Sequence, residues 1–265
     1  MSEVRFYYDE TTYLSFEKNG SGSRILILFH GFGLTKAIFR PWLSHLGNQF
    51  TVYSIDLFYH GDSMRPHGRL RKKAWKEMFI QFLDEQNIDR FSVLGFSLGG
   101  RFAICSAIEL SQRCDHLILV APDAIYKTPW FKAATSFGLR WIFKYFMFHP
   151  KQMDWFIRNS VKTRIVSKYM ADFVEKELGK AENRKRVYIS WNHFKPLGYT
   201  RQKLRKAFSD ASYKRTIILG SKDIVIPPKK VLPILSNCGF NEIIIDKKHH
   251  QMIQEDIGRL ISELS

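Results

Sequence analysis

A serine between two glycines is the residue of this sequence best suited to covalent chemistry. The motif Gly95-Phe96-Ser97-Leu98-Gly99 fits G-x-S-x-G; it follows the apolar run 91–94 and precedes a segment with helical periodicity. A sharp turn from a strand into a helix presents such a serine as a nucleophile, and glycine leaves room where a side chain would collide. We therefore expect Ser97 to attack a carbonyl carbon, while the neighbouring Phe96 packs rather than reacts.

A nucleophilic serine needs a base, usually histidine, and a carboxylate that orients the base. Candidates for both follow later apolar runs: Asp223 comes after the run 216–219, and the pair His249-His250 comes after the run 242–245. Asp123, after the run 116–120, is an alternative acid, although its position also suits a turn or capping residue. The sequence predicts the acid Asp223.

The elements that must position these residues are visible as short, entirely apolar runs separated by segments of helical periodicity. Such runs are typical of strands buried on both faces of a parallel sheet, and strands that alternate with helices indicate a doubly wound α/β fold. Early antiparallel strands are expected near residues 5–8 and 13–17. The expected parallel strands are 24–29, 50–55, 91–94, 116–120, 216–219 and 242–245, and the expected helices are 37–46, 70–85, 97–110, 228–236 and 252–264.

One long stretch, residues 124–200, has helical periodicity without a convincing strand and interrupts this alternation. We interpret it as a helical cap inserted into a core made of residues 1–123 and 201–265, and not as an independent domain. The stretch contains 15 Lys and Arg against 5 Asp and Glu, and 17 of the 39 aromatic residues of the chain. These aromatic residues predict an apolar acyl or aromatic pocket beneath the cap.

Four motifs in order make the sequence resemble the α/β-hydrolase superfamily over nearly its whole length. His30-Gly31-Phe32-Gly33 resembles the HGxG oxyanion loop of that superfamily, and residues 56–63 (DLFYHGDS) resemble its D-x-x-G-x-G-x-S turn, except that Tyr59 stands where glycine is usual. Residues 95–99 supply the nucleophile motif, and residues 220–227 (GSKDIVIP) resemble the segment that carries the acid. The resemblance implies a mostly parallel central sheet flanked by helices, with the helical cap inserted after the sixth strand.

The resemblance also implies roles for the loop residues. The backbone N–H groups of Phe32 and Leu98 would stabilise the oxyanion that forms during acyl transfer. Gly31 and Gly33 would let the loop approach the substrate closely, and His30 would support the loop from behind.

The base has two candidates because two histidines adjoin. The superfamily usually has Gly-His at this point, with an acidic residue about five positions later that begins the last helix. Aligning that acidic residue with Glu255 places His250 in the catalytic position, so we expect His250 to be the base, with His249 as the alternative.

A serine nucleophile excludes the epoxide hydrolases and haloalkane dehalogenases of this fold, which need aspartate at the elbow. We expect a serine hydrolase that cleaves a carboxylic ester, thioester or amide of a small apolar or acyl substrate through an acyl-enzyme. An acyltransferase or a carbon–carbon bond hydrolase with the same triad is the first alternative. A non-catalytic ligand-binding protein is the second.

The composition limits the partners. The formal charge of +16 is accompanied by no nucleic-acid-binding motif, so no nucleic-acid partner is expected. The basic cap, with Lys132, Arg140, Lys144 and Lys151, could contact an anionic membrane. Three cysteines without metal-ligand spacing indicate no zinc site, and no cofactor or other metal is expected. No signal peptide or membrane-spanning run is apparent, so a cytoplasmic location is expected.

Overall fold

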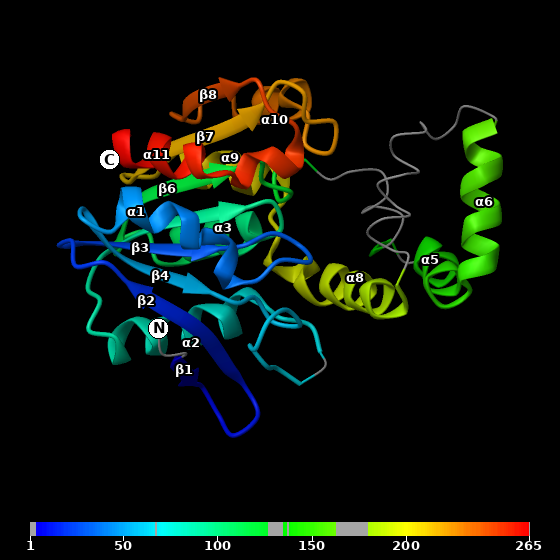
Figure 1. Ribbon diagram of the computed structural model, residues 1–265, viewed down its shortest axis with the longest axis horizontal. Helices are drawn as coiled ribbons and strands as arrows, with labels where there is room; N and C mark the ends of the chain where they lie inside the picture. The colour runs from blue at the N-terminus through cyan, green and yellow to red at the C-terminus, as the bar shows by residue number, and fades with distance from the viewer. Residues whose placement is uncertain (1–3, 67, 127–134, 137, 163–179, 265) are drawn as a thin grey trace. The chain divides into compact units, whose positions relative to one another are not determined.

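The computed structural model describes residues 4–66, 68–126, 135–136, 138–162 and 180–264. The chain divides into two compact units, one formed by Met1–Lys127 and Pro196–Ser265 and the other by Thr128–Lys195. The first unit contains the sheet and the second contains helices (Figure 1).

The first unit is built on an eight-stranded sheet with the strand order β1-β2-β4-β3-β5-β6-β7-β8. β1 and β2 pair antiparallel, β2 pairs antiparallel with β4, and every later pairing is parallel. The mostly parallel sheet and its α/β class are therefore confirmed. The strands are β1 (Val4–Tyr7), β2 (Tyr13–Asn19), β3 (Arg24–Phe29), β4 (Phe50–Ile55), β5 (Phe91–Phe96), β6 (Cys114–Val120), β7 (Lys214–Gly220) and β8 (Asn241–Ile245).

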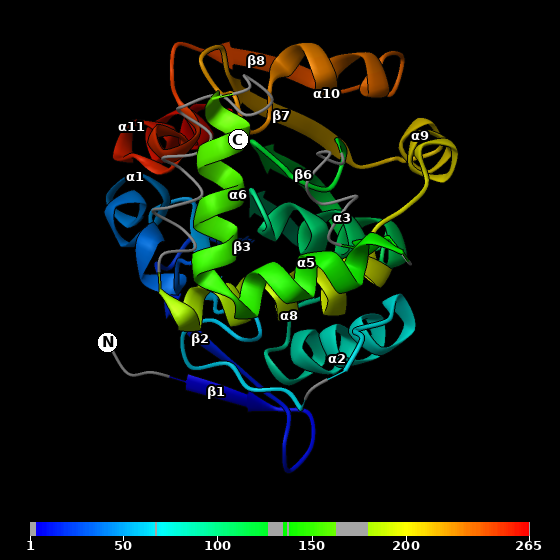
Figure 2. The ribbon, with the colours of Figure 1, turned by 90° about the vertical axis from the view of Figure 1, so that its right-hand side faces the viewer.

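Helices cover both faces of this sheet, as Figure 2 shows. One face carries the 3₁₀ helix η1 (Lys36–Trp42), α1 (Leu43–Leu46) and α11 (Glu255–Glu263), which pack on one another. The other face carries α2 (Lys72–Glu85), α3 (Gly99–Glu109) and α9 (Arg201–Ser209), and α10 (Pro228–Leu235) packs beside α9. The single helix expected at residues 37–46 is instead η1 followed by α1. Pro41 lies within η1, and proline supplies no N–H for a continuous α-helical ladder.

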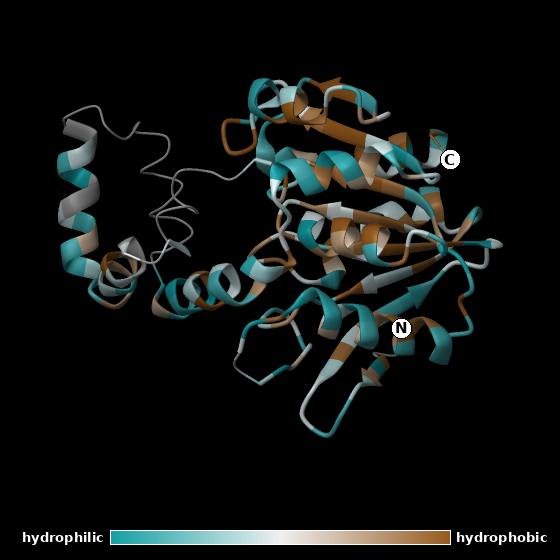
Figure 3. Ribbon diagram, turned by 180° about the vertical axis from the view of Figure 1, so that it is seen from behind, coloured by the Kyte–Doolittle hydropathy of each residue, from teal (hydrophilic) through white to brown (hydrophobic). Residues whose placement is uncertain are grey.

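The core lies between the sheet and these helices, where the central strands are the most hydrophobic part of the molecule (Figure 3). β5 is buried at every position, because α/β packing covers both of its faces. Rings from α2 fill the space beside the sheet: Trp75 stacks on Phe79 with ring centroids 5.2 Å apart, and Phe29 of β3 packs edge-on against Trp75. This packing fixes the strand ends that carry the candidate site.

The second unit is helical where the structure describes it, with α5 (Leu139–Phe148), α6 (Pro150–Lys162) and α8 (Ala181–Phe194). α5 packs on both α6 and α8. Phe143 of α5 stacks on Trp191 of α8 at a centroid distance of 5.7 Å, and Arg184 of α8 donates from Nε to the Met147 carbonyl at 3.0 Å.

Candidate active site

The sequence around Ser97 forms a strained turn between β5 and α3. Ser97 has a φ of +49°, in the left-handed region that side chains rarely adopt. A Cβ on Gly95 would lie 2.5 Å from the Gly99 carbonyl oxygen, and a Cβ on Gly99 would lie 2.1 Å from the Phe29 carbonyl oxygen. The two glycines are thus required for the close approach of backbone that lifts Ser97 above the strand.

A continuous hydrogen-bond chain joins Ser97, His249 and Asp223. The distance from His249 Nε2 to Ser97 Oγ is 3.1 Å, and the distance from His249 Nδ1 to Asp223 Oδ2 is 2.7 Å. A proton on Nδ1 donated to the carboxylate leaves Nε2 free to accept from the serine hydroxyl. Ser97, Asp223 and His249 follow β5, β7 and β8 respectively, so they meet at the carboxyl edge of the parallel sheet.

Asp223 is held as a buried carboxylate aimed at the imidazole. It is 2% exposed, and its Oδ1 accepts hydrogen bonds from the backbone N–H groups of Val225 and Ile226, each at 2.8 Å. These two donors to one oxygen hold the carboxylate in a single rotamer, so that Oδ2 faces His249.

The expectation that His250 occupies the base position is wrong in this geometry, because His249 lies between Ser97 and Asp223 and His250 is exposed. Both residues begin the 3₁₀ helix η3 (His249–Ile253). Successive side chains of a 3₁₀ helix point about 120° apart, so only one of two adjacent histidines can face the carboxylate. The segment before η3 is joined to the loop that carries Asp223, because the Lys222 N–H donates to the Lys247 carbonyl at 3.2 Å.

Phe96 packs against the imidazole that it helps to position. Its ring stacks on that of His249 with centroids 5.4 Å apart and an angle of 30° between the planes. Lys248 precedes the histidine as the N-cap of η3, and its N–H donates to Gln251 Oε1 at 2.8 Å. The ring contact and the capped turn together restrict the rotation of His249.

The loop after β3 presents the other expected group, the backbone N–H of Phe32. Within the described part of the chain, the N–H groups of Phe32 and Leu98 donate no hydrogen bond to protein. His30 Nδ1 lies 2.7 Å from the Gly31 carbonyl oxygen, and Leu57 N–H donates to His30 Nε2 at 3.0 Å. Because the Gly31 carbonyl and the Phe32 N–H belong to one trans peptide, His30 sets the direction of both.

Replacing His30 by alanine is expected to lower kcat for an ester substrate by up to about 10²-fold, because the Phe32 N–H loses its fixed direction. KM should change less, since the ground-state carbonyl depends less on that donor. Steady-state kinetics with a p-nitrophenyl ester measures both. His45→Ala, at a partly exposed position of α1 outside the loop, is the control. An unchanged kcat in a folded His30→Ala variant would contradict the positioning role.

An ionic cluster centred on the buried Lys36 and Asp56, which residue patterns did not point to, lies beside this loop. Lys36 Nζ contacts Asp56 Oδ2 at 2.8 Å, Ser15 Oγ at 3.0 Å and Asp62 Oδ2 at 3.3 Å. Burial alone would lower the pKa of Lys36, but its bonds to Asp56 and Asp62 outweigh burial and raise the pKa. The cluster fastens η1 to the turn 56–63, where Tyr59 adopts a φ of +67°, the conformation for which the resembling motif uses glycine.

Asp123, the alternative acid, is engaged elsewhere. Arg101 holds it with two parallel hydrogen bonds, Nε to Oδ1 at 2.8 Å and Nη2 to Oδ2 at 3.0 Å. The Asp123 N–H also donates to the Ser97 carbonyl at 3.1 Å. Both carboxylate oxygens thus serve the ion pair beside the elbow, and the structure brings Asp223, not Asp123, to the histidine.

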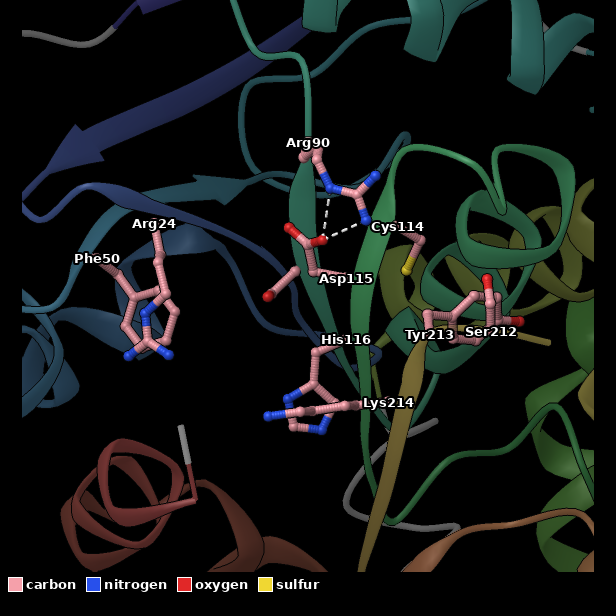
Figure 4. A pocket seen from close by; sticks show the side chains of 10 residues that line it. Arg24, Phe50, Arg90, Cys114, Asp115, His116, Ser212, Tyr213 and Lys214 are labelled. Carbon is pink, nitrogen blue, oxygen red and sulfur yellow. Dashed lines mark hydrogen bonds and ion pairs between the residues drawn. The ribbon is translucent and has the colours of Figure 1, made fainter.

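A cavity of about 380 Å³ lies at the opposite, amino edge of the strands (Figure 4). Its lining includes Arg24, Lys214 and the ion pair of Arg90 with Asp115, together with the buried His116. None of Ser97, Asp223 and His249 lines it. The carboxyl edge, with its hydrogen-bonded chain, is therefore the candidate active site.

His30 and His116 make stability dependent on pH. Burial lowers the pKa of each from 6.5 to about 4; Lys214 and Arg24 lower it further in His116, whereas the Gly31 carbonyl opposes the shift in His30. As the pH falls, the unfolded chain therefore binds protons before the folded chain does. The contribution of these histidines to the free energy of unfolding is complete above pH 6.5 and is lost between pH 6.5 and about 4. Each histidine lowers the free energy of unfolding by up to about 1.4 kcal/mol per pH unit in this range. Urea unfolding of a His116→Gln variant should show a shallower fall by one histidine, and an equal slope would contradict this origin.

Among the described residues, no group of three or more His, Cys, Asp or Glu side chains is arranged to hold a metal ion. Likewise, no helix in the described ranges is long and apolar enough to cross a bilayer. Cys105, Cys114 and Cys238 are buried free thiols.

A serine, an imidazole and a carboxylate at the carboxyl ends of three strands of one parallel sheet form the arrangement typical of hydrolases with a serine nucleophile. The family model for the alpha/beta hydrolase fold matches residues 24–256, and the chain belongs to this family. It is similar over its full length to the structure of a thermophilic esterase from Thermogutta terrifontis, with 19% identity, a TM-score of 0.72 and coverage of 98% of that chain.

Curated relatives match part of the chain. A pimeloyl-[acyl-carrier protein] methyl ester esterase of Aliivibrio salmonicida is 35% identical over 111 residues, which cover 42% of this chain and 40% of the relative. The human 1-acylglycerol-3-phosphate O-acyltransferase ABHD5 is 32% identical over 123 residues, covering 44% and 34% respectively. The aligned segment thus spans two fifths or less of the length of these relatives.

Proposed function

We propose that the chain is a serine hydrolase that cleaves a carboxylic ester of an acyl substrate through an acyl-enzyme. The observation that carries the proposal is the chain from Ser97 Oγ through His249 to Asp223, with distances of 3.1 and 2.7 Å. An isolated serine hydroxyl is a weak nucleophile, and this arrangement supplies both its base and the orientation of that base.

In the first half-reaction, Ser97 Oγ attacks the ester carbonyl carbon while His249 Nε2 takes the hydroxyl proton. The negative charge that develops on the carbonyl oxygen is stabilised by the N–H groups of Phe32 and Leu98. Asp223 stabilises the imidazolium that has formed. His249 then returns the proton to the departing alkoxide, which leaves as an alcohol, and the acyl group stays on Ser97.

In the second half-reaction, water replaces the alcohol. His249 accepts a proton from the water as its oxygen attacks the acyl carbon. Collapse of the second tetrahedral intermediate releases a carboxylic acid, and the proton on His249 restores the Ser97 hydroxyl. Each half-reaction uses the same three side chains and the same two N–H groups.

The relatives that align with part of the chain support an acyl substrate. One relative bears the name of a methyl ester esterase acting on an acyl group, which agrees with an ester of a fatty or dicarboxylic acyl chain. The acyltransferase name of another supports the alternative that an alcohol, not water, receives the acyl group from Ser97. The acyl pocket expected from the aromatic residues of 124–200 stays a prediction, as does the non-catalytic alternative.

The test is a panel of p-nitrophenyl and methyl esters of increasing acyl length, with Ser97→Ala as the matched control. Hydrolysis by the parent, lost in the variant, is expected, with a free acid as the product. Addition of glycerol or a lysophospholipid and analysis of acylated products separates hydrolysis from transfer. If the folded parent turned over no ester and transferred no acyl group, the proposed function would be wrong.

A further inference from the structure

The outward face of α5 is apolar, contrary to the usual pattern of a surface helix. Trp141, Tyr145 and Phe148 recur at spacings of four and three residues, which places them on one face of the helix. Trp141 is 63% exposed, and Tyr145 and Phe148 are each about half exposed. Ile142, also about half exposed, flanks this face. The described residues include ten large, exposed apolar side chains, and five of them lie on α5 and α6.

The opposite face of α5 is already occupied. Phe143 stacks on Trp191 of α8, and Met147 is buried and accepts the hydrogen bond from Arg184. The helix therefore buries one apolar face inside its unit and presents a second one outward. On the second face, Phe148 packs edge-on against Tyr188 of α8 and Tyr145 stacks on His149, yet both rings stay about half exposed. Among the described residues, packing therefore covers this face only in part.

α6 lies beside α5 (Figure 2). It carries a basic stripe with one aromatic residue. Lys151, Trp155 and Arg158 recur at spacings of four and three residues, and all three are exposed, Trp155 by 68%. Lys144 lies on the outward face of α5, with Nζ 5.9 Å from the centre of the Trp141 ring. Lys132 and the side chain of Arg140, expected in this basic rim, lie outside the described part of the structure.

The charges and aromatic rings of this face indicate which kind of partner it binds. The segment 139–162 carries five Lys or Arg and one Asp, so a second copy of the same face would be repelled. Exposed tryptophan and tyrosine beside lysine and arginine is the pattern of helices that lie at a membrane interface, where the rings enter the headgroup region and the cations meet anionic lipid.

We propose that the outward face of α5 and α6 binds the surface of an anionic phospholipid bilayer. Trp141, Tyr145, Phe148 and Trp155 insert at the level of the headgroups, and Lys144, Lys151 and Arg158 contact lipid phosphate and carboxylate groups. Binding is peripheral and requires neither the ester chemistry nor Ser97, so the proposal stands or falls independently of the proposed function.

Vesicle co-sedimentation tests the proposal with phosphatidylcholine alone and with phosphatidylcholine mixed with phosphatidylglycerol. Full-length protein is expected to sediment with the anionic vesicles, to bind the neutral ones weakly, and to dissociate as salt rises. Ser97→Ala should bind as the parent does. Absence of binding to anionic vesicles at low salt would overturn the proposal.

Two variants locate the contact. Trp141→Ala with Trp155→Ala should lower the partition coefficient roughly tenfold or more for the loss of two inserted rings, and Lys151→Ala should lower it roughly fivefold. Tyr7→Ala and Lys73→Ala, at exposed positions of β1 and α2, are the matched controls. Circular dichroism checks that each variant is folded.

Tryptophan fluorescence supplies an independent readout. Anionic vesicles should shift the emission of the parent to shorter wavelength and should not shift that of the double variant. If the double variant bound and shifted like the parent, the face would not be the contact. If it instead lost ester turnover or formed oligomers with unchanged vesicle binding, the face would serve substrate or a second copy, and the proposal would be wrong.

Discussion

Replacing His249 by alanine is expected to lower kcat/KM for a p-nitrophenyl ester by about 10⁴- to 10⁶-fold. His249 is the imidazole within hydrogen-bond reach of Ser97 Oγ, and no proton leaves the serine without it. The neighbouring His250→Ala is the matched control: it removes the same side chain from the next position, which is exposed, and should change kcat/KM only a few-fold.

The two variants identify the base directly, because both positions lie in η3 and receive the same substitution. Equal losses in the two variants would indicate that the turn rearranges during catalysis. A large loss in His250→Ala with little loss in His249→Ala would contradict the geometry and restore the expectation drawn from the spacing to Glu255. Steady-state rates, corrected for folded protein by circular dichroism, provide the comparison.

Asp223→Asn is the second substitution with a large expected effect, a loss of about 10⁴-fold in kcat. The amide keeps the volume of the carboxylate, and its oxygen can still accept from Val225 and Ile226, as Asp223 Oδ1 does. The NH₂ group then faces His249 and favours the wrong tautomer, in which Nε2 carries the proton and cannot act as base.

Asp123→Asn distinguishes the role of Asp123 from that of Asp223. Because Asp123 is bound by Arg101 in two hydrogen bonds, its replacement removes the negative charge that faces the buried guanidinium and should reduce stability by about 3 kcal/mol. Activity per folded molecule should fall far less than in Asp223→Asn. If Asp123→Asn lost as much kcat while staying equally stable, Asp123 would be the acid.

The fold was predictable because the central parallel strands contain short apolar runs. β3 matches the expected run 24–29 residue for residue, and β5 extends the run 91–94 by two residues into the serine motif. Ser97 was recognisable for a local reason, since the motif, the preceding strand and the following helix are contiguous. Asp223 was recognisable because it directly follows a strand end.

Other features depend on contacts that no local pattern records. Which of two adjacent histidines faces the acid depends on the phase of a 3₁₀ turn, and a one-residue change in spacing to Glu255 reverses the choice. The cluster of Lys36 with Asp56 and Asp62 joins groups 20 and 26 residues apart. The pairing of Arg101 with Asp123 likewise needs the turn geometry of the elbow.

The most direct test of the central claim, that Ser97 is a nucleophile activated by His249 and Asp223, is mass spectrometry after treatment with a fluorophosphonate. The expected result is one covalent adduct per chain, mapped by peptide sequencing to Ser97, formed in the parent and in His250→Ala and strongly slowed in His249→Ala. An adduct on another residue, or no adduct on folded protein, would contradict the account.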